Sequence, residues 1–522
     1  MVHCGALECI GCSGRVGRTI TEKCVLTTTQ SLCGSGVAGL NEVLNGGFPR
    51  GHVYLIQGEP GAGKTTLGMQ FLLEGARNHE RVLYITFSET RQELSTIAES
   101  HGWDIGRVHL LELSAIEPQI RPESLNTLFH PAEIELNQIT KIMLDEIERV
   151  KPMRVVFDSV SEMRMLSEVS SRFRRVMLAM KQRLTQSQVT VLLLDDLTTS
   201  PRELQIQSIV HGVVYLQMMP MAFGTERRRI SVTKMRGVHF RGGYHDFVIQ
   251  KGGIEVFPRM VAGEHYRTFE RGTISSGIAA LDSLLGGGLD RGTSNLLMGP
   301  AGSGKSTIAL QYAVAAAARN EPVAVYSFEE SLEVMLLRCD AVGLNVRGEI
   351  DRGHLSVTNI DTAEISPGAL TQRIRRSVEQ GVRMVVIDSL NGYIHAMPEE
   401  QSLLLQLHEL LSYLNRQGVV TILVLAQQGL MGPMQTPVDV TYLADSTIIT
   451  RYFEASGSVH KAISVVKKRS GPHEDTIREL KIGPGGVRVG EPLQHFRGVM
   501  TGVPVYTGST EGILSLKPDV AR

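Results

Sequence analysis

Two glycine-rich segments of the chain each end in a lysine followed by a hydroxyl residue, and both fit the pattern G-x-x-x-x-G-K-[ST]. In this pattern backbone N–H groups surround the phosphates of a nucleotide, and the lysine reaches the terminal phosphates. The segments therefore predict two nucleotide sites, with ATP as the expected ligand. The expected binding residues of the first site are Gly58, Glu59, Pro60, Gly61, Ala62, Gly63, Lys64, Thr65 and Thr66. Those of the second site are Gly299, Pro300, Ala301, Gly302, Ser303, Gly304, Lys305, Ser306 and Thr307.

Two apolar segments that end in aspartate occupy corresponding places in the two halves, residues 154–158 and 384–388. A buried strand of this kind delivers a carboxylate to the sheet edge at which open α/β folds bind ligands. Hydroxyl and carboxylate oxygens are the ligands that Mg²⁺ prefers. We therefore expect Mg²⁺ at both sites, and the expected ligands are Thr65, Asp158, Ser306 and Asp388.

Acidic residues follow another apolar segment in each half, Glu89 in the first and Glu329 and Glu330 in the second. A carboxylate beside the terminal phosphate can orient the attacking water or take its proton. The alternative interpretation is a helix cap or a surface charge. The expected place beside the phosphate favours catalysis by Glu89 and Glu330, with Glu329 supporting Glu330.

A pair of cations closes each half at the end of an apolar strand, Lys234 with Arg236 and Lys467 with Arg469. One interpretation is a solvated strand end. The other is a cationic finger that stabilises charge on the terminal phosphate bound by a neighbouring subunit. Because the pair occurs in both halves, we favour the finger. It implies a ring or filament with sites between subunits.

Apolar strands alternate with helical segments around these residues in both halves. The pattern predicts an α/β fold with two tandem domains, each a doubly wound and mostly parallel sheet. In each, a strand leads into the P-loop and a helix follows it, residues 66–76 and 307–318. The expected division is a disordered tail at 1–30, domains at 31–262 and 263–490, and a C-terminal tail at 491–522.

The composition limits the class of protein. The 522 residues are 42% hydrophobic and 20% charged, with a net charge of −1, so no global charge attracts DNA, RNA or an anionic membrane. No apolar run is long enough to span a bilayer, and a cytoplasmic location is expected. Most cysteines lie near the N-terminus, where Cys9 and Cys12 with His3 and Cys4 could hold zinc. We interpret this segment as a polar tail, because a second C-x-x-C pair is missing.

The residues described above resemble the KaiC family, the double-domain RecA-like ATPases related to the cyanobacterial circadian clock protein. The resemblance covers about residues 31–490 and also includes the segment 445–467. It implies two stacked RecA-like domains that assemble into a double-ring hexamer, with ATP between the protomers. By the same resemblance, the first domain forms an ATPase ring. The second forms a ring that phosphorylates and dephosphorylates its own Ser and Thr residues.

Two positions depart from the family pattern. The paired catalytic glutamates are present in the second domain, but the first domain has Ser88 before Glu89. The adjacent Ser and Thr phosphosites of the clock protein fall on Thr441 and Tyr442, so an ordered two-site cycle is in doubt. The expected phosphate acceptors are Thr441, Ser446 and Thr447.

The leading hypothesis is an ATP-hydrolysing signalling ring with Ser/Thr autokinase and autophosphatase activity in its second domain. Its expected partners are further copies of itself and unidentified signalling proteins, with no membrane. A second hypothesis is a RecA- or DnaB-like motor on DNA, for which the basic run Arg227-Arg228-Arg229 could serve. We interpret that run as a solvated turn between strands and do not expect DNA binding. A third hypothesis is a hexameric scaffold that ATP only holds together.

Overall fold

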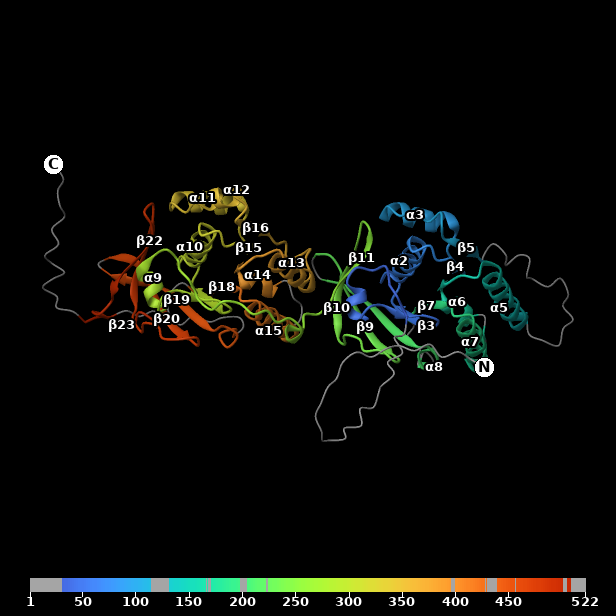
Figure 1. Ribbon diagram of the computed structural model, residues 1–522. Helices are drawn as coiled ribbons and strands as arrows, with labels where there is room; N and C mark the ends of the chain where they lie inside the picture. Colours follow the sequence, from blue (N-terminus) through green and yellow to red (C-terminus); the bar gives the residue numbers. More distant parts are fainter. Residues whose placement is uncertain are drawn as a thin grey trace, which may run out of the picture.

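The computed structural model describes residues 31–113, 131–165, 167, 170–197, 204–221, 224–395, 400–427, 429, 439–455, 457–500 and 505–507. The expected tail at residues 1–30, with its possible zinc ligands, lies outside this part of the chain, as does the C-terminus from residue 508. Figure 1 shows two layered α/β units arranged side by side, one from each half of the sequence.

The first unit is built on a nine-stranded sheet with the order β11-β10-β9-β8-β3-β7-β6-β4-β5. Neighbours from β8 to β5 pair in parallel, whereas β9, β10 and β11 extend the sheet with antiparallel pairs. The strands are β3 (Val53–Gly58), β4 (Val82–Thr86), β5 (His109–Glu112), β6 (Arg154–Asp158), β7 (Thr190–Asp196), β8 (Gly212–Met219), β9 (Arg227–Met235), β10 (Tyr244–Gln250) and β11 (Gly253–Phe257).

The second unit repeats this order strand for strand, as β22-β21-β20-β19-β14-β18-β17-β15-β16. Its strands are β14 (Ser294–Gly299), β15 (Val323–Ser327), β16 (Leu355–Asn359), β17 (Met384–Asp388), β18 (Val420–Ala426), β19 (Ser446–Ala455), β20 (Ser458–Lys468), β21 (Arg478–Gly483) and β22 (Gly486–Pro492). The expected fold class, two tandem α/β domains with mostly parallel sheets, is confirmed.

Helices cover both faces of each sheet. In the first unit they are α1 (Leu40–Val43), α2 (Lys64–Arg77), α3 (Arg91–His101), α5 (Pro131–Val150), α6 (Val160–Met165), α7 (Ser170–Gln186) and α8 (Leu204–Ile209). In the second they are α9 (Ala279–Leu284), α10 (Lys305–Ala317), α11 (Leu332–Ala341), α12 (Val346–Asp351), α13 (Pro367–Glu379), α14 (Leu390–His395) and α15 (Glu400–Arg416). Short pairs and a 3₁₀ turn complete the chain: β1 (Leu32–Cys33) with β2 (Phe48–Pro49), β12 (Thr273–Ile274) with β13 (Leu289–Asp290), β23 (Phe496–Arg497) with β24 (Val505–Tyr506), and Ala262–Glu264.

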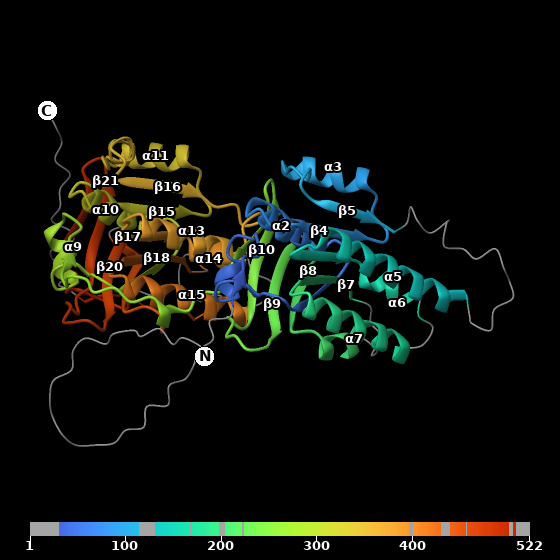
Figure 2. The same cartoon turned by 45° about the vertical axis from the view of Figure 1, so that its right-hand side comes forward.

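Each sheet separates two apolar cores because successive side chains of a strand point to opposite faces. Ile56 of β3 packs in the core that contains Phe71 of α2, whereas Leu55 packs in the core that contains Met143 of α5 and Met177 of α7. Figure 2 shows α2 and α3 on one side of the first sheet and α5 and α7 on the other. The second sheet is covered in the same way. Burial on both faces fixes where each strand ends, and so where the site residues emerge.

The two units contact each other mainly through α13 of the second. The Asp246 carboxylate accepts a hydrogen bond from the Gly368 N–H at the start of α13, at 2.8 Å. Arg375 lies 3.2 Å from Glu42, and Arg376 lies 2.7 Å from Glu255. First-domain carboxylates thus meet the positive end and the basic side chains of one helix.

The basic run at residues 227–229 begins strand β9, so the prediction of a solvated turn is wrong. Arg227 is buried, and its guanidinium donates to the Thr362 carbonyl of the second domain at 3.0 Å. Arg229 lies 3.6 Å from Asp246. Two of the three arginine side chains are therefore engaged at or near the contact between the domains.

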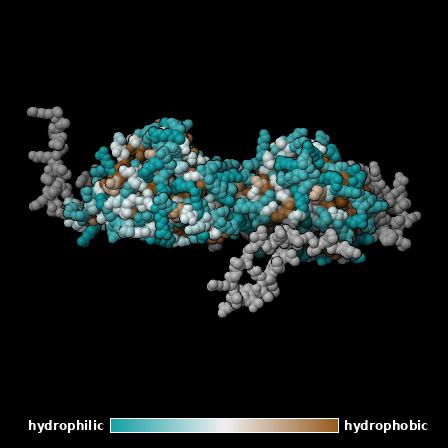
Figure 3. All heavy atoms as spheres, in the orientation of Figure 1, coloured by the Kyte–Doolittle hydropathy of each residue, from teal (hydrophilic) through white to brown (hydrophobic). Residues whose placement is uncertain are grey.

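The face of the molecule shown in Figure 3 is mainly hydrophilic, with small and scattered apolar areas. Within the part of the chain that the structure describes, no helix is both long enough and apolar enough to cross a membrane.

Candidate nucleotide-binding sites

Both P-loops have the backbone geometry that curls N–H groups around an anion. In the first, β3 ends at Gly58 and α2 begins at Lys64, with Gly63 at φ 101° between them. A side chain at Gly63 would place its Cβ 2.7 Å from Ile249 Cδ1. Gly304 has the same role before α10, with φ 99°. Glycine is required at both positions because the positive φ and the close neighbour exclude a side chain.

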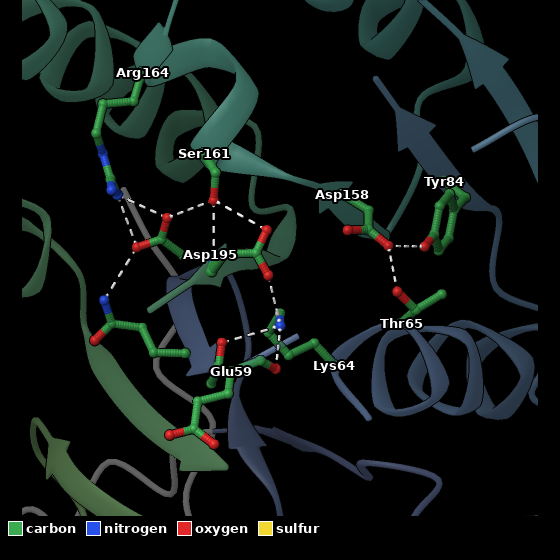
Figure 4. Close-up of polar contacts among 11 residues, drawn as sticks. Glu59, Lys64, Thr65, Tyr84, Asp158, Ser161, Arg164 and Asp195 are labelled. Atoms are coloured by element: carbon green, nitrogen blue, oxygen red, sulfur yellow. Dashed lines mark hydrogen bonds and ion pairs between the residues drawn. The ribbon is translucent and has the colours of Figure 1, made fainter. Parts of the chain in front are cut away.

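The first P-loop lysine is buried and fully engaged. Lys64 Nζ donates to the carbonyls of Gly58 at 3.0 Å and Glu59 at 2.9 Å. It also lies 2.7 Å from Oδ1 of Asp196, at the end of β7. Figure 4 shows these contacts converging on the lysine from the P-loop and the neighbouring strand. In the second site Lys305 donates to the Pro300 carbonyl at 2.7 Å.

A hydroxyl and a carboxylate meet at each site where the sequence predicts Mg²⁺. Thr65 Oγ1 donates to Asp158 Oδ2 at 2.7 Å, and Tyr84 donates to the same oxygen (Figure 4). Ser306 and Asp388 are the equivalent pair of the second site, where the serine hydroxyl acts to lower the pKa of Asp388. Burial raises the pKa of Asp158 and of Asp388, although these hydrogen bonds oppose the rise. Each set of oxygens fits Mg²⁺, and a divalent cation would supply countercharge to a carboxylate buried in this way.

Neither carboxylate at the end of β7, Asp195 or Asp196, was among the expected site residues. Asp195 is fully buried, and Arg164 of α6 donates to both of its oxygens at 2.7 and 2.8 Å. Gln57 of β3 donates to Asp195 as well, at 3.1 Å. This network ties α6, β3 and β7 together beside the P-loop. The adjacent aspartates Asp195 and Asp196 indicate the edge of the sheet at which the site lies. The sequence does not indicate which of the two carboxylates contacts Lys64.

The expected catalytic glutamates of the second domain have different partners. Glu329 accepts a hydrogen bond from Ser389, which follows Asp388. Glu330 instead forms a two-point ion pair with Arg338 of α11, through distances of 3.0 and 2.6 Å. In the first domain, partial burial and the charges of Asp158 and Glu93 raise the pKa of Glu89. The sequence treats Glu89 and Glu330 as equivalents, whereas their surroundings differ.

The repeated architecture has a counterpart among known proteins. A model of the KaiC ATPase family matches residues 33–261 and again residues 274–494. The chain belongs to the KaiC ATPase family. This result confirms the resemblance deduced from the motifs, and with it the assignment of two tandem RecA-like domains.

Curated relatives match along nearly the whole KaiC-type chain. The circadian clock protein KaiC3 of Synechocystis sp. is 26% identical over 499 residues, which cover 91% of this chain and 95% of that protein. The circadian clock protein KaiC2 of the same organism is 28% identical, over 90% of this chain and 83% of the relative. The circadian clock oscillator protein KaiC of Synechococcus elongatus is 24% identical, over 90% and 91%.

The paired cations of this KaiC-family chain bind backbone carbonyls in both domains. Lys234 donates to Gln207 and Ser208, and Arg236 donates to Ser208. In the second domain Lys467 and Arg469 make the corresponding contacts with carbonyls of residues 441–444. Among the residues described, none of the four hydrogen-bonds or ion-pairs with the P-loop of its own domain. Each pair is therefore held as a rigid unit, separate from the nucleotide site beside it.

The three expected phosphate acceptors lie in very different surroundings. Thr441 is half-buried, and its hydroxyl donates to Asp439 at 2.6 Å. Ser446 and Thr447 lie in strand β19, where only 1% and 2% of their surfaces are exposed. A phosphate could reach those two only if β19 left the sheet. The structure therefore favours Thr441 over Ser446 and Thr447 as an acceptor.

Proposed function

We propose that this KaiC-family protein hydrolyses ATP at both P-loops as a homohexameric ring, and phosphorylates and dephosphorylates its own Thr441 in the second domain. The observation that carries the ATPase proposal is the duplicated pairing of a P-loop hydroxyl with a buried aspartate, Thr65 with Asp158 and Ser306 with Asp388. These pairs would hold Mg²⁺, which supplies charge neutralisation between the β- and γ-phosphates. Membership in an ATPase family supports the same proposal.

The P-loop lysines perform the binding step. Lys64 and Lys305 are buried at the mouths of the loops, where their ammonium groups exchange carbonyl oxygens for phosphate oxygens. The oxygen of a water molecule then bonds to the γ-phosphorus, a neighbouring glutamate accepts a proton from that water, and the bond between the γ-phosphorus and the bridging oxygen breaks. ADP and phosphate leave. Positioning and charge do most of this work, since phosphoryl transfer needs little covalent help from protein groups.

The autokinase proposal rests on the contact between Lys467 and the Thr441 loop. Lys467 Nζ donates to the Thr441 carbonyl at 2.7 Å, so the proposed trans cation and the proposed acceptor move as one unit. If that cation reaches a neighbouring subunit's γ-phosphate, it brings the Thr441 hydroxyl to the same nucleotide. In the transfer, the Thr441 oxygen bonds to the γ-phosphorus, its proton passes to a carboxylate, and ADP leaves.

Purified protein with Mg²⁺ and γ-labelled ATP tests both parts. We expect free phosphate and label on the protein, with the label mapped to Thr441. K64A should remove phosphate release from the first site, and K305A should remove the protein label. Phosphate release without protein label would refute the autokinase proposal and leave an ATPase ring. The absence of both free phosphate and protein label would refute the proposed function as a whole.

A further inference from the structure

One guanidinium connects three elements of the second site. Arg338, on α11, donates through Nε and Nη2 to the two oxygens of Glu330, at 3.0 and 2.6 Å. Through Nη1 it donates to Thr307 Oγ1 at 3.2 Å. Thr307 follows Ser306 on the P-loop helix. Arg338 therefore links the Glu330 side chain to Thr307, and both carboxylate oxygens of Glu330 are engaged by the guanidinium.

The first domain lacks this arginine. The helices α3 and α11 begin at equivalent N-caps, Thr90 and Ser331, directly after Glu89 and Glu330. Counted from those caps, Ile97 stands where α11 has Arg338, and the buried positions of the two helices agree in register. Within the described residues, no lysine or arginine forms an ion pair with Glu89. The two domains therefore differ at this position, because Arg338 forms an ion pair with Glu330 and Ile97 has no charge to offer Glu89.

Glu329 has a different partner from Glu330. It accepts a hydrogen bond from Ser389, the neighbour of the expected Mg²⁺ ligand Asp388. Glu329 and Asp388 are also the two anions whose charges act on the P-loop lysine Lys305. The first domain has a serine, Ser88, where the second has Glu329. Among the described residues, Glu89 in the first domain and Glu329 in the second are thus the strand-end glutamates that form no ion pair with an arginine.

We propose that Arg338 is a positioning residue that holds Glu330 away from the reacting atoms and leaves Glu329 to accept the proton in the second domain. In the first domain Glu89 accepts it, at the position equivalent to Glu330. The inference rests on the proposed function and reverses the roles that the sequence suggests for the two glutamates. The two domains would then use carboxylates from different positions after equivalent strands, Glu89 after β4 and Glu329 after β15.

The test measures second-site turnover of the full chain in the K64A background, with phosphate release and protein label as readouts. We expect E329Q to lower kcat by about 100-fold with little change in KM, the usual effect of losing a general base. The decisive variant is the double substitution E329Q with R338I, which copies the first domain and frees Glu330. We expect it to regain at least about tenfold in kcat over E329Q alone. The double substitution E329Q with R338K keeps a positive charge at this position, and we expect it to regain no kcat over E329Q alone.

Several outcomes would overturn the assignment. One is E330Q costing as much kcat as E329Q, and another is a double variant no faster than E329Q while it still binds ATP. E333Q, an exposed carboxylate on the same helix, serves as the matched control and should behave as the wild type. A double-mutant cycle of R338I and E330Q, measured as shifts in Tm, tests the ion pair without an activity assay. Additive shifts in Tm would show that Arg338 and Glu330 do not interact. A wild-type protein that releases no phosphate would instead refute the proposed function.

Discussion

In the first P-loop the Lys64 ammonium lies 2.7 Å from the Asp196 carboxylate, whereas the equivalent position of the second domain is alanine, Ala426. Asp196 thus occupies a contact that the phosphates need, and it repels them. We expect D196N to tighten ATP binding at the first site by about five- to tenfold, or ~1 kcal/mol. Equilibrium binding of a fluorescent ATP analogue in the K305A background measures this. The reciprocal variant A426D should weaken binding at the second site, and unchanged affinity in both would show that Asp196 does not compete with phosphate.

Ile97 of the first domain stands at the position of Arg338, so an arginine placed there should form an ion pair with Glu89. We expect I97R to lower first-site kcat by about tenfold, because the new guanidinium would engage Glu89 as Arg338 engages Glu330. Phosphate release in the K305A background is the measurement. I97K and I97Q separate the two-point ion pair from charge and bulk. Equal losses in all three would indicate a steric effect instead.

Mixed subunits test whether the cations act on a neighbour. We expect R469A to lower second-site turnover with ATP binding retained, since Arg469 contacts its own Tyr442 carbonyl and not its own P-loop. K305A should also lose second-site turnover, because it removes the lysine that binds the phosphates of ATP. In a randomly mixed ring, about a quarter of the interfaces combine an intact P-loop with an intact cation. Mixing the two inactive variants should therefore restore activity toward that fraction, and no recovery would place Arg469 within its own subunit's site.

The contact between the domains has a predictable pH dependence. Burial works against ionisation of Glu42, but the guanidiniums of Arg375 and Arg241 lower its pKa below the usual value of 4.5. A carboxylate with a lowered pKa stabilises the fold above its unfolded-state pKa, and this contribution disappears as the pH falls through the folded-state pKa. We expect E42Q to cost about 1 kcal/mol of unfolding free energy at pH 7. Urea unfolding from pH 7 to pH 3 should show the difference shrinking below about pH 4.5, and a constant difference would mean lost packing instead.

Much of the site could be predicted from the sequence because its signals are local. The P-loop glycines and the apolar strands before Asp158 and Asp388 depend on short-range spacing. The antiparallel extension formed by β10, β11 and their equivalents was not predicted. Apart from β11, those strands are only partly buried, so their hydrophobic pattern is weak.

The partners of charged residues could not be predicted, because they lie far apart in sequence or depend on helix register. Arg338 reaches Glu330 only because α11 turns back over the strand end. Lys64 and Asp196 come together only when β3 and β7 pair. The run that begins at Arg227 was misread for the same reason, since its partner Thr362 belongs to the other domain.

Helix α13 gives the molecule a mechanical property. One side of it, including Leu370 and Ile374, is fixed in the core of the second domain. Its N-terminus and its arginines are fixed to carboxylates of the first domain through Asp246, Glu42 and Glu255. Turning one domain against the other must either break these charged contacts or carry the helix along. α13 therefore couples the orientation of one domain to the packing of the core of the other.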